Sequence, residues 1–535
     1  MSVAQMLAPP AGLPPGMDCS DERQCLAFLA GLPLTDAARA QERLAALVAG
    51  MERSPPRPES LLRILETARS PLDFVQTELG ARYSMRPLQP GGEGDMVLGR
   101  VVSLWQAMAR AYAAVAREGA GQPAVQGHIA LICQRCLLYS SQVVIECFRA
   151  RRDVLPGAWS EAHGYYLTAE ELGIASTNVA GDVGGKPQYE SCLETYTALL
   201  LVDLSNPNGR TPREFAWICR WARRFSRVVA LHKTEAGSSS IYGVDLNLDS
   251  GAQPVRQLSE GYYLRQLDME RLKEGLQGVL SRLQHGTDPV ALGLGKDCVQ
   301  PAVTRLMMRL FRCWCMNGRT RRFPRHGGVG EAETALGFET IHHQVTGTRF
   351  LQPGYRRSFS RTEAEALVTL GDLAETPEGE RPPPGSLVGT EDWRVLDESV
   401  SGFRLRRDGP GAGLTYGDLV GLRLAGSEQC LLCRICWLMY RRDGALQIGV
   451  FLLPGAPKGV AVRPGEGATA DEPWVPAFLL PGMEILKEAP SLVLPRGWFQ
   501  AGRVLEVHAI RPFRVRLDAV ATGGTNFDRV SFTTL

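Results

Sequence analysis

The sequence predicts a multidomain α+β protein, in which an N-terminal α-helical region is followed by a C-terminal antiparallel β-barrel region. Three observations support this prediction. The chain has 535 residues, which is too long for a single hydrophobic core. Apolar residues recur at helical spacing over much of residues 21–316. After Arg325 the pattern changes to short alternating runs separated by Gly and Pro, which is typical of a small antiparallel barrel or sandwich.

The first predicted domain, residues 1–120, is helical. Apolar residues recur at three- and four-residue intervals, as in Leu26, Leu29 and Leu32. Proline-rich breaks at 54–56 and at 88–92 interrupt the pattern. We therefore expect several short helices rather than one long one.

A second helical domain is predicted over residues 121–316. It should begin with a long, strongly apolar helix over 126–152 and continue with a helix over 189–202, closed by the turn-rich segment 205–209. The dipeptide Thr211-Pro212 has the pattern of an N-cap followed by proline at the first helical position. A further helix should therefore start there.

The remainder of this domain is mixed. Short apolar pieces and Gly/Ser turns over 229–254 indicate a small β insertion, and helical periodicity resumes over 264–283 and 302–316. The helices with their interspersed aromatic residues loosely resemble tetratricopeptide repeats. No 34-residue self-similarity accompanies the resemblance, so a repeat-like and an irregular helical domain both remain open.

Two short motifs carry most of the functional information. Residues 321–325, Arg-Arg-Phe-Pro-Arg, read R-x-x-x-R, and residues 397–402, Asp-Glu-Ser-Val-Ser-Gly, read D-x-S-x-x-G. Guanidinium groups bind phosphate bidentately and also pair with or stack on guanine. In the second motif Asp397 and Ser399 supply short polar side chains at a strand end. Gly402 permits a backbone conformation or a close approach that a Cβ would block.

Together the two motifs resemble the signature motifs of the PilZ family, whose members bind the bacterial messenger cyclic di-GMP. The strand-like runs on either side of the second motif, 393–396 and 403–405, extend the resemblance, as do 416–420 and 446–450. The resemblance covers residues 317–455. It implies a PilZ-like barrel with a cyclic di-GMP site made by Arg321, Arg322, Arg325, Asp397, Ser399 and Gly402.

The spacing of the motifs departs from the family pattern. Arg325 and Asp397 are 72 positions apart, whereas a few tens of residues are typical of PilZ domains. An insertion around residues 340–390 would account for the gap. A second R-x-x-x-R, from Arg357 to Arg361, lies nearer to the acidic motif and is an alternative source of arginines. Residues 456–535 are expected to add a C-terminal extension of β-strands.

Other features argue for a non-catalytic cytoplasmic protein. The formal net charge of +2 provides no general attraction for DNA or for an anionic membrane. No signal-peptide pattern precedes the 13 cysteines, so reduced thiols are expected. No apolar run approaches the roughly 18–20 residues that span a bilayer, so no membrane insertion is expected. The series Cys430-x-x-Cys433-x-x-Cys436 is interpreted as core residues. The pair His342-His343 is not expected to bind a metal, because the nearby carboxylates have no recognised ligand spacing. No nucleophile or metalloprotease motif is found, so we expect neither enzyme activity nor a cofactor.

These observations predict a receptor in which cyclic di-GMP binding at the barrel changes what the helical domain contacts. We expect the helical domain to contact a protein partner. The resemblance places such receptors in bacterial signalling. Two other functions remain open. One is a helical scaffold with a degenerate, non-binding PilZ-like barrel, and the other is an RNA-binding protein with an OB-like barrel, which the near-neutral charge disfavours.

Overall fold

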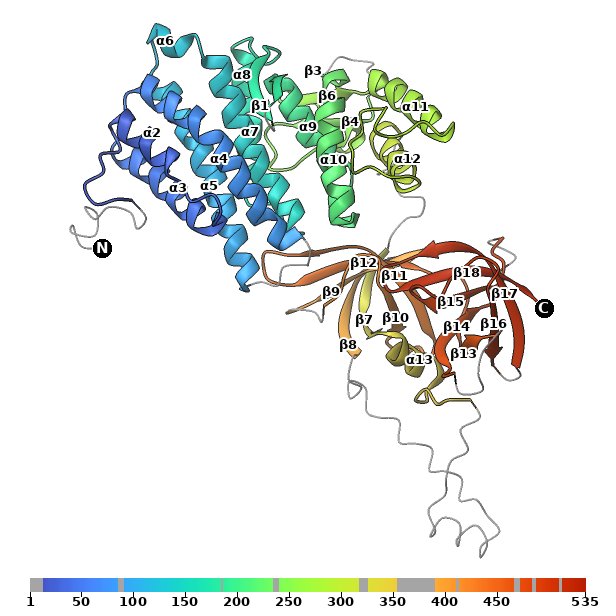
Figure 1. Ribbon diagram of the computed structural model, residues 1–535. Helices are drawn as coiled ribbons and strands as arrows, with labels where there is room; N and C mark the ends of the chain where they lie inside the picture. The colour runs from blue at the N-terminus through green and yellow to red at the C-terminus, as the bar shows by residue number, and fades with distance from the viewer. Residues whose placement is uncertain are drawn as a thin grey trace, which may run out of the picture. The chain divides into compact units, whose positions relative to one another are not determined.

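The computed structural model describes residues 13–84, 91–183, 186–233, 240–316, 326–353, 390–409, 413–465, 472–483, 487–509 and 512–535. The chain divides into two compact units, Met1–Arg321 and Arg322–Leu535. Figure 1 shows the helices of the first unit in blue to green and the strands of the second in yellow to red. The predicted order of a helical region followed by an antiparallel barrel region is confirmed.

The first unit is built mainly from helices that pack against their neighbours in the chain. The α-helices are α2 (Glu22–Ala30), α3 (Ala37–Arg53), α4 (Pro58–Ser84), α5 (Glu93–Glu118), α6 (Pro123–Gln126), α7 (Ile129–Arg149), α8 (Ala158–Glu171), α9 (Cys192–Leu204), α10 (Pro212–Phe225), α11 (Glu270–Gln284) and α12 (Ala302–Cys315). Short 3₁₀ turns are η1 (Pro207–Gly209), η2 (Ser226–Val228) and η3 (Val255–Gln257). Because α4 has 27 residues and α2 has 9, the unit is not an array of equal repeats.

The helix predicted to start at Thr211 does so. The Thr211 hydroxyl accepts a hydrogen bond from the Glu214 backbone N–H, and the Glu214 carboxylate accepts one from the Thr211 N–H at 3.0 Å. Pro212 occupies the first helical position, where a missing N–H has no effect on the helix. The same capping box, from Ser191 and Glu194, starts α9.

Helix α7 forms the centre of the first unit, because it packs against α5, α8 and α9. By length and composition alone it could cross a membrane, but 67% of its most apolar window is buried inside the unit. Its role in this structure is that of a core helix.

Two small β structures interrupt the helices. Strands β1 (Val179–Val183) and β2 (Lys186–Glu190) form a hairpin. Strands β3 (Ala230–Lys233), β4 (Tyr242–Asp245), β5 (Gln253–Pro254) and β6 (Leu264–Asp268) form a sheet of order β3-β6-β4-β5. The prediction of a helix from residue 264 is wrong at its start. Residues 264–267 are buried in the central strand, so they lack the alternation of a half-buried strand.

The second unit begins with a closed barrel, called here the first barrel. Its core is formed by alternating inward-facing side chains such as Val395, Leu405 and Ile448. The strands, which pair in the order β10-β11-β12-β9-β8-β7, are β7 (His326–Leu336), β8 (Thr390–Ser399), β9 (Gly402–Arg407), β10 (Leu419–Leu424), β11 (Cys430–Tyr440) and β12 (Leu446–Leu452).

Residues 456–535, for which the sequence predicted only an extension of strands, form a second closed barrel, because β16 pairs back onto β13. Helix α13 (Phe338–Thr346) joins the two barrels through a shared core that includes Ile341 and Phe478. The strands of the second barrel, in the order β13-β14-β15-β18-β17-β16, are β13 (Lys458–Pro464), β14 (Val475–Leu480), β15 (Ser491–Pro495), β16 (Val504–His508), β17 (Pro512–Gly523) and β18 (Phe527–Thr534).

Candidate functional site

The predicted ligand residues fall into two groups. Asp397, Ser399 and Gly402 lie at the end of β8 and the start of β9. The arginine motif, Arg321, Arg322 and Arg325, lies outside the described residues, as do Arg357 and Arg361. The first described residue after the arginine motif is His326, at which β7 begins.

The arginine and acidic motifs are 72 positions apart in the chain, but the pairing of β7 with β8 brings the residue that follows the arginine motif beside the acidic motif. In this antiparallel ladder His326 is opposite Glu398, and Gly327 is opposite Asp397. The intervening segment connects the other ends of the two strands, where Ala335 is opposite Thr390. The chain therefore enters the barrel beside the acidic motif, and the insertion leaves from the opposite end of the strands.

A β-bulge determines the direction of the Asp397 side chain. The register between β8 and β9 shifts between Val395 and Asp397, so that Asp397 is opposite Arg404. Such a bulge re-aims a side chain at the end of a strand. The Asp397 carboxylate Oδ2 lies 2.8 Å from Arg404 Nε. Asp397 is only 8% exposed, whereas the Arg404 side chain is 39% exposed, so the carboxylate supports an accessible guanidinium.

The rest of the acidic motif forms a two-residue hairpin turn. Ser399 and Gly402 are the last pair before the turn, and the Ser399 hydroxyl donates a hydrogen bond to the Gly402 carbonyl at 3.1 Å. A Cβ on Gly402 would lie 2.0 Å from the backbone oxygen of Val450 on β12. The glycine is therefore required by a close approach of two backbones, which is one of the two roles predicted for it.

Two aromatic residues that the sequence analysis did not assign to the site lie on neighbouring strands. Trp437 on β11 is paired with Gly449, and its indole occupies the space where a Gly449 Cβ would be, with Nε1 2.0 Å from that position. Phe451 is paired with Gly402 and is 45% exposed. Only the strand register, which aligns these residues with the motif, could have identified them.

The cysteines predicted to be core residues include Cys430 and Cys433, and both are buried. Among the residues that the structure describes, no group of three or more His, Cys, Asp or Glu side chains is placed to bind a metal ion. Burial raises the pKa of the Cys430 thiol to about 12 and raises that of Cys433 as well. Both cysteines are therefore protonated core residues at neutral pH.

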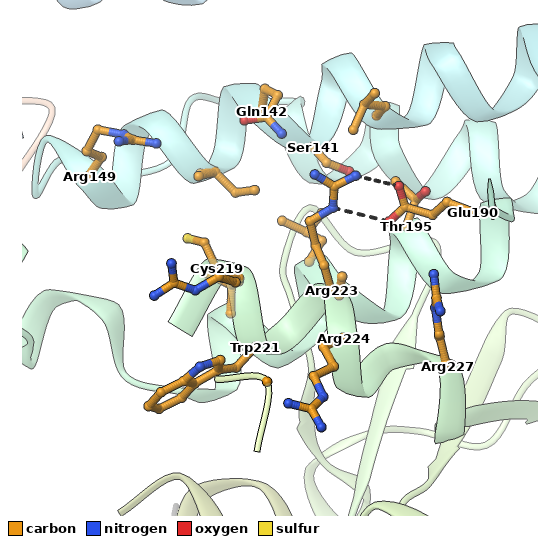
Figure 2. A pocket seen from close by; sticks show the side chains of 17 residues that line it. Ser141, Gln142, Arg149, Glu190, Thr195, Cys219, Trp221, Arg223, Arg224 and Arg227 are labelled. Carbon is orange, nitrogen blue, oxygen red and sulfur yellow. Dashed lines mark hydrogen bonds and ion pairs between the residues drawn. The ribbon is translucent and has the colours of Figure 1, made fainter. Parts of the chain in front are cut away.

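A cavity of about 640 Å³ lies in the first unit between α7, α9 and α10, and is called here the arginine groove (Figure 2). Its apolar lining residues include Ala198, Leu199 and Val202 of α9. Its charged lining residues are one carboxylate, Glu190, and five arginines: Arg149, Arg220, Arg223, Arg224 and Arg227.

Several of these arginines are already held by the protein. Arg223 points across the groove to Glu190, with Nη2 2.8 Å from the carboxylate (Figure 2). Arg220 forms an ion pair with Asp297 at 2.7 Å. Arg224 instead donates to the carbonyl of Leu292 at 2.6 Å. Partial burial, followed by the nearby Arg282, lowers the pKa of Arg224. Because its lining holds five arginines and one carboxylate, the groove is electropositive.

Comparisons with known proteins bear on both ends of the chain. Residues 23–236 match the family described as the cyclic-di-GMP receptor FimW, N-terminal domain. Residues 460–535 match the FimW C-terminal beta-barrel domain. Together the two matches cover more than half of the chain, and they include most of the helical unit and the second barrel. No curated protein matches the chain.

Proposed function

Because this chain belongs to the FimW family of cyclic-di-GMP receptors, we propose that it is a non-catalytic receptor that binds cyclic di-GMP on the outer face of the first barrel. The ligand contacts are assigned to Arg321, Arg322 and Arg325 of the entering chain and to the acidic motif, Asp397 to Gly402. The single observation that carries this assignment is the pairing of His326 and Gly327 with Glu398 and Asp397.

This pairing supports a joint role for the two motifs. Arg325 is bonded to His326, the first residue of β7, which is the strand that pairs with the acidic motif. Consecutive Cα atoms are about 3.8 Å apart, so the Arg325 Cα lies about that far from the Cα of His326. An arginine side chain extends several ångströms from its Cα. It can therefore bind a phosphate that lies beside the β8–β9 hairpin. Arg357 and Arg361 belong to the insertion that leaves from the other end of β7 and β8, which makes them the less favoured source of arginines.

The proposal assigns different roles to the polar residues of the acidic motif. Asp397 holds Arg404 through the 2.8 Å ion pair, so Arg404 is added to the ligand-facing set. Ser399 closes the hairpin through its hydrogen bond to Gly402, which fixes the edge of the site. Gly402 allows β9 to approach β12 closely, which places the hairpin against the strand that carries Phe451.

Calorimetric titration of cyclic di-GMP into the full chain tests the proposal, with Arg325→Ala and Ser399→Ala alongside. We expect micromolar or tighter binding that both substitutions weaken strongly. Absence of heat, together with absence of thermal stabilisation by the ligand, would contradict the proposal. The scaffold with a degenerate barrel would then be favoured, and Arg321→Ala and Arg325→Ala should leave its partner binding intact.

We further propose that the helical unit carries the output of the receptor through contact with a cytoplasmic protein partner. The arginine groove supports this idea, because a lining of arginines and apolar side chains suits an acidic amphipathic segment. A ligand that binds the arginine motif, which precedes β7 in the chain, would couple binding to what the helical unit contacts. The partner proposal is separate from ligand binding, and each can fail without the other.

A further inference from the structure

The row of residues that contains Asp397 and Arg404 continues across two more strands of the first barrel. In register across β8, β9, β12 and β11 lie Asp397, Arg404, Gly449 and Trp437. Side chains in one row of a sheet point to the same face, and neighbouring strands are about 4.8 Å apart. The indole of Trp437 therefore lies on the same outer face as the ion pair.

The glycine in this row makes room for the indole over β12. A Cβ at Gly449 would collide with three indole atoms, Nε1, Cε2 and Cδ1, at 2.0, 2.3 and 2.7 Å. The ring thus extends from β11 over β12, the strand next to β9. Trp437 remains partly exposed in this position.

The neighbouring outward row has a similar composition. It contains Ser399, Gly402, Phe451 and Arg434, on β8, β9, β12 and β11. Here the glycine of the acidic motif is paired with Phe451, which is 45% exposed. Gly449 and Phe451 are two residues apart on one strand, about 6.6 Å, so both aromatic rings occupy one patch.

An exposed aromatic patch with arginines along its edge suits a purine nucleotide. Bases stack on aromatic side chains with little dependence on their identity, and guanidinium groups pair with phosphate or with the O6 and N7 atoms of guanine. We propose that Trp437 and Phe451 form the base-stacking wall of the cyclic di-GMP site, with Arg404 and Arg434 beside it. This inference rests on the function proposed above and adds residues that neither motif contains.

A purely structural role for Trp437 makes different predictions. If the indole only shields Gly449 from water, its removal lowers stability and leaves ligand affinity unchanged in the folded protein. If it stacks on a guanine, its removal lowers affinity, and phenylalanine, which keeps an aromatic face, restores most of it. Phe451 is 45% exposed, so its removal should cost little stability and act mainly on binding.

The test is calorimetric titration of cyclic di-GMP into the full-length protein and into Trp437→Ala, Trp437→Phe and Phe451→Ala. We expect Trp437→Ala and Phe451→Ala each to weaken binding about tenfold or more, and Trp437→Phe to remain within a few-fold of the wild type. Ligand-induced change in tryptophan emission should decrease strongly in Trp437→Phe although that variant still binds. Met439→Ala, at the next outward position of β11 away from the motif, is the matched control and should bind normally.

The outcomes separate this inference from the function on which it rests. Normal affinity in both Trp437→Ala and Phe451→Ala, with the wild type binding, would overturn the aromatic wall and leave the receptor function intact. Absence of binding by the wild type would overturn both. If Trp437→Ala does not fold, the result with Phe451→Ala decides, because shortening an exposed side chain has little effect on stability.

Discussion

The Asp397 carboxylate lies 2.8 Å from Nε of Arg404, across the β8–β9 ladder. The β-bulge before Asp397 places both side chains on the same face, and the acid is covered while the guanidinium is accessible. The aspartate of the D-x-S-x-x-G motif thus positions an arginine seven residues later in the chain. A motif residue that acts through a neighbour is a positioning residue, and its effect on affinity should depend on that neighbour.

The first prediction concerns this dependence. Arg404→Gln should weaken cyclic di-GMP binding about tenfold or more, because a charge-assisted hydrogen bond contributes about 1.5–3 kcal/mol. Asp397→Asn should also weaken binding, but the double variant should lose little more than Arg404→Gln alone. Isothermal titration of the three variants measures the coupling. The control is Arg394→Gln, an exposed arginine on β8 paired only loosely with Asp408 at 3.9 Å, which should bind normally. Additive losses would show that Asp397 acts independently of Arg404.

The second prediction concerns Gly402. A methyl group there would meet the Val450 carbonyl oxygen at 2.0 Å, so Gly402→Ala must separate β9 from β12. We expect a loss of about 1–3 kcal/mol in the free energy of unfolding, the usual range for overpacking. Thermal melting should show the loss without ligand. Gly330→Ala on β7 is the matched control, since a Cβ at that position has open space. Equal melting temperatures for the two variants would contradict the close approach as the reason for the glycine.

Local sequence was sufficient to predict some of the site. The D-x-S-x-x-G spacing predicted short polar groups and a close-approach glycine at a strand end, and Ser399 and Gly402 are arranged in this way. Alternating runs predicted the strands that flank the motif. Both features depend on residues within a few positions of one another, and such signals are readable without knowledge of tertiary pairing.

The rest of the site depends on pairings between distant residues. Arg404 and Trp437 lie beside the acidic motif only because of the registers of β8 with β9 and of β11 with β12. A shift of one residue in either register would move the side chain to the other face of the sheet. Closure of residues 458–534 into a barrel similarly depends on the pairing of β13 with β16, over 40 positions apart in the chain. The family matches also fall on the helical unit and the second barrel, to which the motifs gave no function.

The third prediction concerns the arginine groove. If the groove contacts an acidic segment of a partner, Arg224→Glu combined with Arg227→Glu should abolish partner association and leave cyclic di-GMP affinity unchanged. Arg224 and Arg227 are suitable because both are exposed and donate hydrogen bonds to backbone carbonyls, whereas Arg220 and Arg223 pair with carboxylates. Titration calorimetry and quantitative co-purification with an identified partner measure the two properties. Arg271→Glu, exposed on α11, is the charge-matched control. A partner that associates equally with both reversed proteins would exclude the groove as its binding surface.

The fourth prediction concerns the pH dependence of stability through His163. This ring is 1% exposed, with Nδ1 2.7 Å from the Tyr196 hydroxyl and Nε2 3.1 Å from the Ser250 carbonyl. A neutral ring that donates from Nε2 and accepts at Nδ1 satisfies both partners. Burial lowers the pKa of His163 below its usual 6.5, although Asp249 and Asp245 oppose the shift.

Because the folded state favours the neutral ring, the unfolded chain binds more protons below about pH 6.5. The contribution of His163 to the free energy of unfolding is therefore complete above pH 6.5 and is lost as the pH falls through 6.5 toward the lower folded-state pKa. His163→Gln, which cannot titrate, should flatten the decline of melting temperature between pH 7 and pH 5. Both the wild type and His163→Gln retain a second buried histidine of lowered pKa, His342. The informative quantity is therefore the difference between the two proteins in the slope of melting temperature against pH. His285→Gln, exposed at the end of α11, should leave the slope as it is. An unchanged slope in His163→Gln would mean that the ring is not held neutral by its burial.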